Sequence, residues 1–239
     1  MRIKVLNPDY GISDAGLRER ECKLAAVLRP DTEVHMECVT RTEVFVDSQK
    51  DVALAARELI ELAVKAENDG FDAIVLYCGS DPAITAIREM VRIPVVGGGL
   101  ASFLYANALG YSFSLLTTGI GRAPEKRAFV SSLGYRAERL RSVRGLSIPD
   151  DAIHGDRENT MALLEAEAKK CVLEDGAEVI VLGCLSFLGY AAELSARVGI
   201  PVIDPCYASV LLAESLVTMG LAHSKVSYPA PPVTDLPAW

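Results

Sequence analysis

One segment of the chain occurs twice in related form. Residues Glu67–Cys78 and Glu174–Cys184 both run from the charged end of an expected helix through a glycine into a short apolar strand, and in both a cysteine comes eight residues after the glycine. An Ile-Pro-Val segment follows each copy, with its proline sixteen residues after Cys78 and seventeen residues after Cys184. Chance readily produces one apolar run that ends in cysteine, but a match in all these features indicates duplication. The chain is therefore expected to contain two half-domains of like construction.

Short apolar runs alternate with helix-length amphipathic stretches, which is typical of parallel strands joined by crossover helices. We expect an α/β protein made of two pseudo-symmetric, Rossmann-like (flavodoxin-like) parallel-sheet halves, with the active-site cleft between them and functional groups at the carboxyl ends of the strands. The first half is expected to comprise residues 1–97 and 206–239, and the second residues 98–205. The expected strands are Ile3–Leu6, Glu33–Cys38, Ala73–Cys78, Val95–Gly97, Ser112–Thr117, Arg139–Val143, Val179–Cys184 and Val202–Ile203. The expected helices are Gly16–Val27, Asp51–Asp69, Asp81–Met90, Ala101–Leu109, Ala123–Leu133, Glu158–Glu174, Gly189–Val198 and Tyr207–Met219.

Charge and hydropathy exclude several classes of function. The 239 residues carry a formal net charge of −8 without a run of lysine or arginine, which argues against nucleic-acid binding. No apolar stretch is long enough for a membrane span, and the first residues lack the apolar core and cleavage site of a signal peptide. We therefore expect a cytoplasmic protein, in which the six cysteines are free thiols because the compartment is reducing.

The repeated cysteines, Cys78 and Cys184, suit a reaction that needs two acid/base groups. If the two halves pack face to face, one thiol lies on each side of a bound molecule, and a thiolate and a thiol can exchange roles. Small or polar residues follow each cysteine and lead toward a helix, whose amide groups lower the pKa of a thiol and can hold an enolate oxygen. In the first copy, Asp81 is expected to be the N-cap of that helix and Pro82 its first residue.

Each candidate also has a purely structural interpretation. A single cysteine at a strand end is most often a small buried hydrophobe, and it is the pairing that favours catalysis. Asn7 can be simple turn punctuation, and Thr117 and Thr118 can be ordinary β-branched strand residues, although both places lie at strand ends. The remaining thiols are interpreted as core or surface residues, with Cys206 as one that can line the cleft; they are Cys22, Cys38, Cys171 and Cys206.

These residues resemble the aspartate/glutamate/hydantoin racemase superfamily, and within it the hydantoin and allantoin racemase branch. The resemblance covers nearly the whole chain. It rests on Asn7-Pro8-Asp9, Cys78-Gly79-Ser80-Asp81-Pro82, Thr117-Thr118, Val181-Leu182-Gly183-Cys184, and a tail with Ser224-Lys225, Tyr228 and Pro231-Pro232.

The resemblance implies a racemase or epimerase that works without metal, pyridoxal phosphate or nucleotide, transfers a proton at a carbon next to a carbonyl, and acts as a homo-oligomer. Cys78 and Cys184 would be its acid/base residues. The implied substrate-binding groups are Asn7, Gly79, Ser80, Thr117, Thr118, Leu185 and Ser186.

Departures from the family pattern bear on the substrate. Amino-acid racemases of the family usually carry asparagine and threonine after the first cysteine, whereas this chain has Gly79-Ser80-Asp81, which favours a ring amide such as a 5-substituted hydantoin or allantoin. Asp9-Tyr10-Gly11 and Leu185-Ser186-Phe187 are also unusual for the hydantoin branch. The alternatives are an aspartate or glutamate racemase, an enzyme like maleate isomerase or arylmalonate decarboxylase, and a small-molecule binding or sensing protein.

Overall fold

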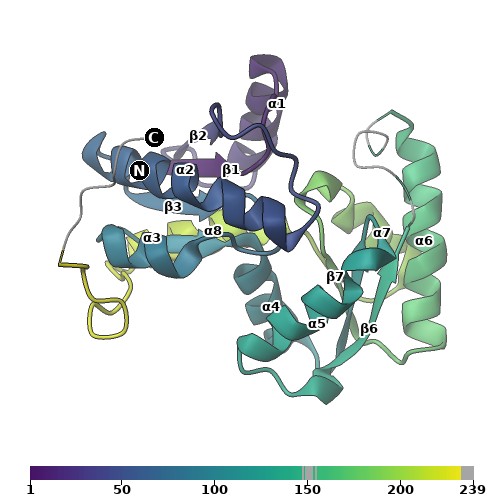
Figure 1. Ribbon diagram of the computed structural model, residues 1–239. Helices are drawn as coiled ribbons and strands as arrows, with labels where there is room; N and C mark the ends of the chain where they lie inside the picture. The colour runs from purple at the N-terminus through teal and green to yellow at the C-terminus, as the bar shows by residue number, and fades with distance from the viewer. Residues whose placement is uncertain (147, 149–152, 154, 233–239) are drawn as a thin grey trace. The chain divides into compact units, whose positions relative to one another are not determined.

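The computed structural model describes residues 1–146, 148, 153 and 155–232 (Figure 1). The chain forms two compact units. The first consists of Met1–Gly98 together with the chain from Ser209 onward, and the second of Gly99–Ala208. Among the described residues, no helix has the length and apolar character needed to cross a membrane.

The first unit contains a four-stranded parallel sheet in the order β2-β1-β3-β4. The central strands β1 and β3 are almost wholly buried, and β3 is accordingly a continuous apolar run. Two of the helices begin at a serine N-cap, Ser13 for α1 and Ser48 for α2, whose side chain accepts a backbone N–H. The elements are β1 (Arg2–Asn7), α1 (Asp14–Ala25), β2 (Glu33–Cys38), α2 (Gln49–Asn68), β3 (Ala73–Leu76), α3 (Ile84–Met90) and β4 (Val95–Gly97).

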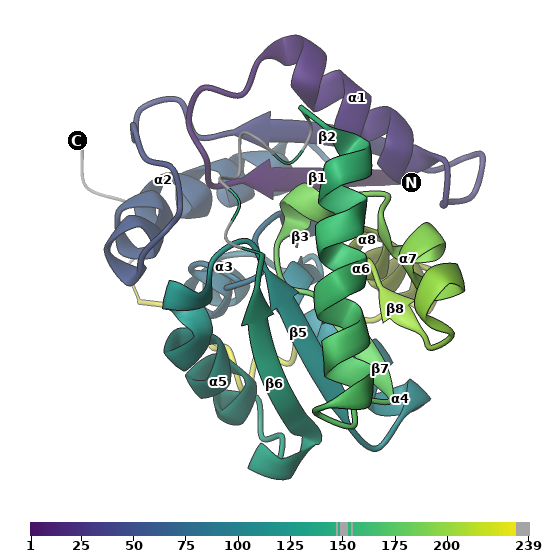
Figure 2. The same ribbon diagram turned by 90° about the vertical axis from the view of Figure 1, so that its right-hand side faces the viewer.

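The second unit repeats this plan with the strand order β6-β5-β7-β8, again wholly parallel. Helix α6 packs on β5 and β6, and α5 packs on β6 (Figure 2). The elements that follow β4 along the chain are α4 (Gly98–Leu109), β5 (Phe113–Thr117), α5 (Ala123–Ser132), β6 (Leu140–Gly145), α6 (Arg157–Leu173), β7 (Val179–Leu182), α7 (Ala191–Val198), β8 (Val202–Ile203) and α8 (Pro205–Thr218), with short 3-10 helices η1 (Ile120–Arg122), η2 (Ala137–Arg139) and η4 (Leu185–Phe187). The two parallel sheets of equal topology confirm the α/β fold expected from the repeat.

The helix that follows the last strand of each sheet belongs mostly to the other unit. Helix α4 follows β4 of the first sheet, yet Phe103 of α4 stacks on Phe113 of the second unit, with ring centroids 5.5 Å apart. Helix α8 follows β8 of the second sheet, yet from Ser209 onward it belongs to the first unit, where Glu214 accepts hydrogen bonds from the Thr32 hydroxyl at 2.5 Å and the Arg29 amide at 3.1 Å. Helices α4 and α8, which follow equivalent strands, thus each belong mostly to the unit that does not contain the preceding strand.

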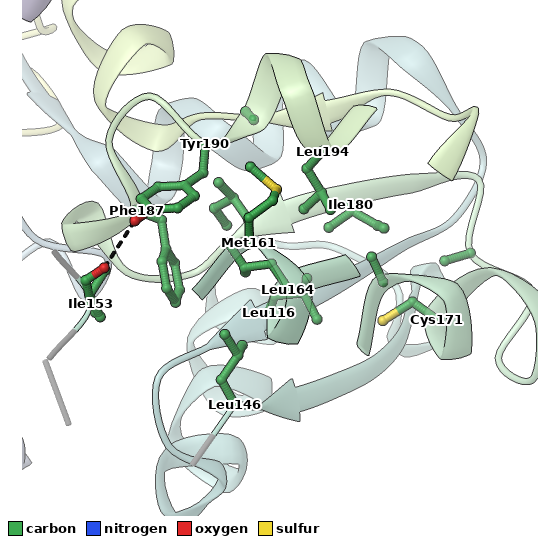
Figure 3. Close-up of a cluster of buried hydrophobic side chains, with 14 residues drawn as sticks. Leu116, Leu146, Ile153, Met161, Leu164, Cys171, Ile180, Phe187, Tyr190 and Leu194 are labelled. Carbon is green, nitrogen blue, oxygen red and sulfur yellow. Dashed lines mark hydrogen bonds between the residues drawn. The ribbon is translucent and has the colours of Figure 1, made fainter. Parts of the chain in front are cut away.

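Each unit has its own apolar core. In the second unit, α6, β7 and the segment after Cys184 enclose a cluster that includes Leu164, Ile180 and Phe187, all fully buried (Figure 3). Its polar edge is satisfied, since the Tyr190 hydroxyl donates to the Ile153 carbonyl at 2.9 Å. The first unit has a corresponding cluster between α2, β3 and α3, which includes Leu59. Burial of these apolar side chains stabilises both sheets.

The chain after α8 returns to the first sheet. His223 Nε2 accepts the Val95 N–H at 2.7 Å, and Lys225 Nζ donates to the Arg88 and Val91 carbonyls at 2.6 Å each, at the C-terminal end of α3. The Arg88 guanidinium donates to the Tyr228 hydroxyl at 3.1 Å. This C-terminal segment, residues 221–228, therefore closes the α3–β4 side of the first unit with polar contacts.

His223 makes the stability of the protein dependent on pH. Burial lowers the pKa of His223 from 6.5 to about 4, and the charges of Arg88 and Lys225 act in the same direction. Because the unfolded chain binds the proton more readily, the stability contributed by neutral His223 is present above pH 6.5 and is lost as pH falls toward 4. In urea unfolding at pH 7, 5.5 and 4, the wild type should therefore lose more stability than His223→Gln, which keeps an acceptor for Val95 and does not titrate. Parallel pH dependence of the two proteins would contradict this assignment.

Candidate active site

The first group of candidate residues lies at the carboxyl edge of the first sheet. Asn7 is the last residue of β1. The neighbouring strand in the sheet, β3, ends at Leu76, two residues before Cys78. Strand β1 pairs with β3, and the Tyr77 amide still donates to the Leu6 carbonyl at 2.8 Å, so the segment with Cys78 leaves the sheet beside Asn7. The strand predicted to reach Cys78 is thus shorter, because backbone pairing with β1 ends at Tyr77.

Asn7 is fully buried and only half satisfied. Its Oδ1 accepts the Asp9 amide at 3.2 Å. Its Nδ2 has no hydrogen-bond partner among the residues that the structure describes. A buried donor without a partner carries a free-energy cost, and a bound molecule that accepts its hydrogen bond would remove that cost.

The loop after Cys78 differs from the prediction. The Asp81 amide donates to the Cys78 carbonyl at 3.2 Å, which closes a turn over the partly buried Gly79 and Ser80. The helix that follows begins at Ile84, not at Asp81, so the prediction of Asp81 as its N-cap is wrong. Asp81 and Ala83 have positive φ angles of 48° and 56°, which place the backbone outside the helical conformation. The Asp81 side chain instead lies over Gly97 of β4.

The second group lies at the carboxyl edge of the second sheet. Thr117 ends β5, and β7 ends at Leu182, two residues before Cys184. The Gly183 amide donates to the Leu116 carbonyl at 2.5 Å, so the strand predicted to run through Cys184 likewise ends two residues early. Thr118 follows Thr117, and its carbonyl accepts the Ile148 amide at 3.3 Å. The geometry therefore repeats that of the first group.

The loop after Cys184 holds a thiol beside a hydroxyl. The Cys184 thiol donates to Ser186 Oγ at 3.2 Å, and the Phe187 amide donates to the Cys184 carbonyl at 3.2 Å. Cys184 is partly exposed, whereas Leu185 and Phe187 of η4 are buried. A serine hydroxyl can reverse its role and donate to a thiolate, so this pair suits a sulfur atom that alternates between its two protonation states.

The two groups correspond residue by residue. Leu6 pairs with Leu76 in the first sheet, as Leu116 pairs with Leu182 in the second. Counting from these pairs, the first group matches the second in order: Asn7 with Thr117, Cys78 with Cys184, Gly79 with Leu185, and Ser80 with Ser186. Each sheet therefore presents a cysteine, a hydroxyl group and two backbone amides at the same place.

Asp204 was not among the candidates from the sequence. Its carboxylate is buried, with Oδ2 accepting the Gly189 amide at 2.7 Å and Oδ1 accepting the Cys206 amide at 2.9 Å. Burial raises the pKa of Asp204, and these backbone hydrogen bonds oppose the rise. Cys206, buried as expected for a core thiol, donates to the Leu185 carbonyl at 3.2 Å. An aspartate between a strand and Pro205 is the sequence signal of such a helix cap.

The other thiols lie in different surroundings. Cys22 is exposed on α1, while Cys38 and Cys171 are buried. Burial raises the pKa of Cys38 and of Cys171, which disfavours a thiolate at either position. Among the described residues, no group of three or more histidine, cysteine or acidic side chains is arranged to hold a metal ion. The candidate residues at the two sheet edges carry thiols, hydroxyl groups and amides.

Comparisons with known proteins bear on the family of the chain. The sequence model of the Asp/Glu/Hydantoin racemase family matches residues 15–213. A hydantoin racemase from Paenarthrobacter aurescens is 35% identical over 237 residues, which are 97% of this chain and 98% of that protein. The solved structure of allantoin racemase from Klebsiella pneumoniae has a TM-score of 0.91 at 27% identity and covers all of this chain and 96% of its own. That of allantoin racemase from Pseudomonas fluorescens has a TM-score of 0.91 at 28% identity, with 100% of both chains covered. The chain therefore belongs to the Asp/Glu/hydantoin racemase family and is an isomerase of the racemase type.

Proposed function

We propose that the protein racemises a 5-substituted hydantoin or allantoin, with Cys78 and Cys184 as the two acid/base residues. The observation that carries the proposal is the matched pair of cysteine loops, one at each sheet edge, in a chain related to hydantoin racemases over nearly its full length. A reaction that removes a proton from one face of a carbon and returns one to the other face requires two such groups.

In the proposed reaction, the thiolate of one cysteine takes the proton from the ring carbon next to the carbonyl. The C–H bond breaks, an S–H bond forms, and the electron pair passes into the carbonyl to give an enolate. The thiol of the other cysteine then donates its proton to the opposite face of the same carbon, which restores the carbonyl and leaves a thiolate. The two cysteines exchange roles for the opposite enantiomer, so the reaction proceeds in both directions without a redox step.

The polar groups beside the cysteines fit a ring amide. Asn7 Nδ2, buried and without a partner among the described residues, is a donor for a ring carbonyl or the enolate oxygen. The backbone N–H groups of Gly79 and Leu185 are further donors, and Ser80, Ser186, Thr117 and Thr118 supply hydroxyl groups for the ring N–H and carbonyl groups. Neutral donors and acceptors of this kind suit a hydantoin ring better than the separate charged ends of a free amino acid.

Racemisation of single enantiomers tests this proposal. We expect the purified protein to racemise at least one of a panel of 5-substituted hydantoins or allantoin, as followed by chiral chromatography, and to incorporate one solvent deuterium at the reacting carbon in D2O. Aspartate and glutamate should remain optically pure. Turnover of aspartate, glutamate, maleate or an arylmalonate in place of every hydantoin would overturn the assigned substrate class, and no turnover of any of them would favour a binding protein.

A further inference from the structure

The paired strands allow the two units to be aligned beyond the cysteine loops. Strand β3 pairs Ile74 with Val95 and Leu76 with Gly97. Strand β7 pairs Ile180 with Val202 and Val181 with Ile203, so the next residue, Asp204, takes the place of Gly97. The turns after the cysteines also match, because the amides of Asp81 and Phe187 both donate to the cysteine carbonyl at 3.2 Å. Asp81 and Phe187 are therefore equivalent positions, as are Gly97 and Asp204.

In the second unit, a buried carboxylate connects the cysteine loop with the next helix. Asp204 extends from the end of β8, and its two oxygens accept the Gly189 amide of the loop and the Cys206 amide in the first turn of α8. The Cys206 thiol adds a bond to the carbonyl of Leu185, the residue after Cys184. The backbone N–H groups at this helix N-terminus stabilise the anion and so oppose the effect of burial on the Asp204 carboxyl group.

In the first unit, the equivalent strand position is Gly97, which has no side chain. A Cβ atom built on Gly97 would lie less than 3.0 Å from all three atoms of the Asp81 carboxyl group. The carboxylate of Asp81, which comes from the loop after Cys78, thus fills the space that the Asp204 side chain fills in the second unit. Asp81 is itself 4% exposed, comparable to the 6% of Asp204.

The backbone conformation after the two cysteines differs in the same way as the source of the carboxylate. Ala83 and Gly189, which are equivalent, both have positive φ angles, 56° and 85°. In the loop after Cys78, Asp81 also has a positive φ, of 48°, whereas its counterpart Phe187 is not among the residues with a positive φ. Its counterpart Phe187 directs its ring into the core of the second unit instead (Figure 3). A conformation of this kind persists when surrounding contacts hold it, and the place of the Asp81 carboxylate over Gly97 is such a contact.

We infer that Asp81 and Asp204 are equivalent positioning residues, each of which joins the cysteine loop of its unit to the end of the last strand and so fixes the place of Cys78 or Cys184. One carboxylate is supplied by the loop and the other by the strand, but both occupy the same position. The inference rests on the proposed role of the cysteines, and it adds that each thiol depends on a carboxylate that does not touch the substrate.

Moving the carboxylate tests the inference. Asp81→Gly should lower kcat for racemisation by about 10²-fold, the effect of displacing a reacting group by about 1 Å, with little change in KM. Asp81→Gly combined with Gly97→Asp supplies the carboxylate from the strand, as in the second unit, and should recover most of that loss. The matched control, Asp81→Gly with Gly97→Asn, has the same shape without the charge and should recover less.

Alkylation of the thiols separates this inference from the proposed function, because it requires no turnover. With iodoacetamide and peptide mass spectrometry, Asp81→Gly should shift the pH-rate profile of Cys78 and leave that of Cys184 unchanged, and the relocated carboxylate should restore it. Asp204→Asn, which replaces one of the two accepting oxygens, should shift the pH-rate profile of Cys184 and leave that of Cys78 unchanged. These results in a protein that racemises no hydantoin would support the positioning role and reject the proposed function.

Two results would overturn the positioning role. If Asp81→Gly folds with an unchanged near-ultraviolet circular dichroism spectrum, keeps the Cys78 profile and retains kcat, the positioning role is wrong while the proposed function stands. Loss of activity that the strand carboxylate does not restore in a folded double variant would also overturn it.

Discussion

Replacing either Cys78 or Cys184 with serine is expected to reduce racemisation by at least about 10²–10⁴-fold, the usual contribution of a general acid or base. The serine side chain keeps the size and hydrogen-bonding capacity of cysteine, but its hydroxyl group does not ionise near neutral pH. The variant therefore lacks one of the two groups that the proposed reaction needs. Initial rates from chiral chromatography measure the loss for each enantiomer.

The control is the same substitution at another thiol. Cys22 is exposed on α1, outside both groups of candidate residues, so Cys22→Ser should leave the rate within about twofold of the wild type. A comparable loss in Cys22→Ser would indicate a general sensitivity to the substitution instead of a role for the two cysteines.

The half-reactions distinguish two bases from one. Each single variant keeps one thiolate, which should still exchange the proton of one enantiomer with deuterium from the solvent without inverting the carbon. Cys78→Ser and Cys184→Ser should exchange opposite enantiomers, as followed by proton NMR in D2O. Exchange of the same enantiomer by both variants, or substantial racemisation by either, would reject the two-base mechanism.

The sequence predicts the strands well where burial on both faces leaves a simple pattern. Residues 73–76 and 179–182 are continuous apolar runs because each is a central strand with neighbours on both sides. The repeat predicts that Cys78 and Cys184 occupy equivalent places, and the shared strand order confirms that the two sheets are alike. Their use in a common reaction remains a prediction.

The contacts of Asp81 could not be predicted from local rules. Asp-Pro before an apolar run indicates an N-cap, and this led to a helix expected to start at Asp81. The helix instead begins at Ile84. The register of β3 and β4 places Gly97, sixteen residues further along the chain, under the Asp81 carboxylate, so this side chain contacts the strand and does not cap the helix. The absence of a side chain at Gly97 is informative only once that register is known. The contact between the Asp204 carboxylate and the Gly189 amide likewise depends on tertiary structure that local sequence rules do not give.

Phe187→Ala should be among the most damaging substitutions outside the cysteines. Phe187 is fully buried in the core of the second unit, and its ring meets that of Tyr190 edge-on with centroids 6.3 Å apart. Removing such a ring from a closed core costs about 3–5 kcal/mol through lost burial and the cavity left behind. The ring anchors the backbone whose amide donates to the Cys184 carbonyl, so its removal should loosen this loop and lower racemisation even where the variant remains folded.

Two further variants make this expectation specific. Phe187→Leu keeps most of the apolar volume and should lose only about 1 kcal/mol, with activity largely retained. Phe45→Ala makes the same chemical change at a ring that is 48% exposed, and its free energy of unfolding should change by about 1 kcal/mol or less. Urea unfolding gives the stabilities, and alkylation of Cys184 reports on the loop. If Phe187→Ala were as stable as Phe45→Ala, or kept the Cys184 alkylation rate and full activity, the core would not be what holds the second cysteine loop in place.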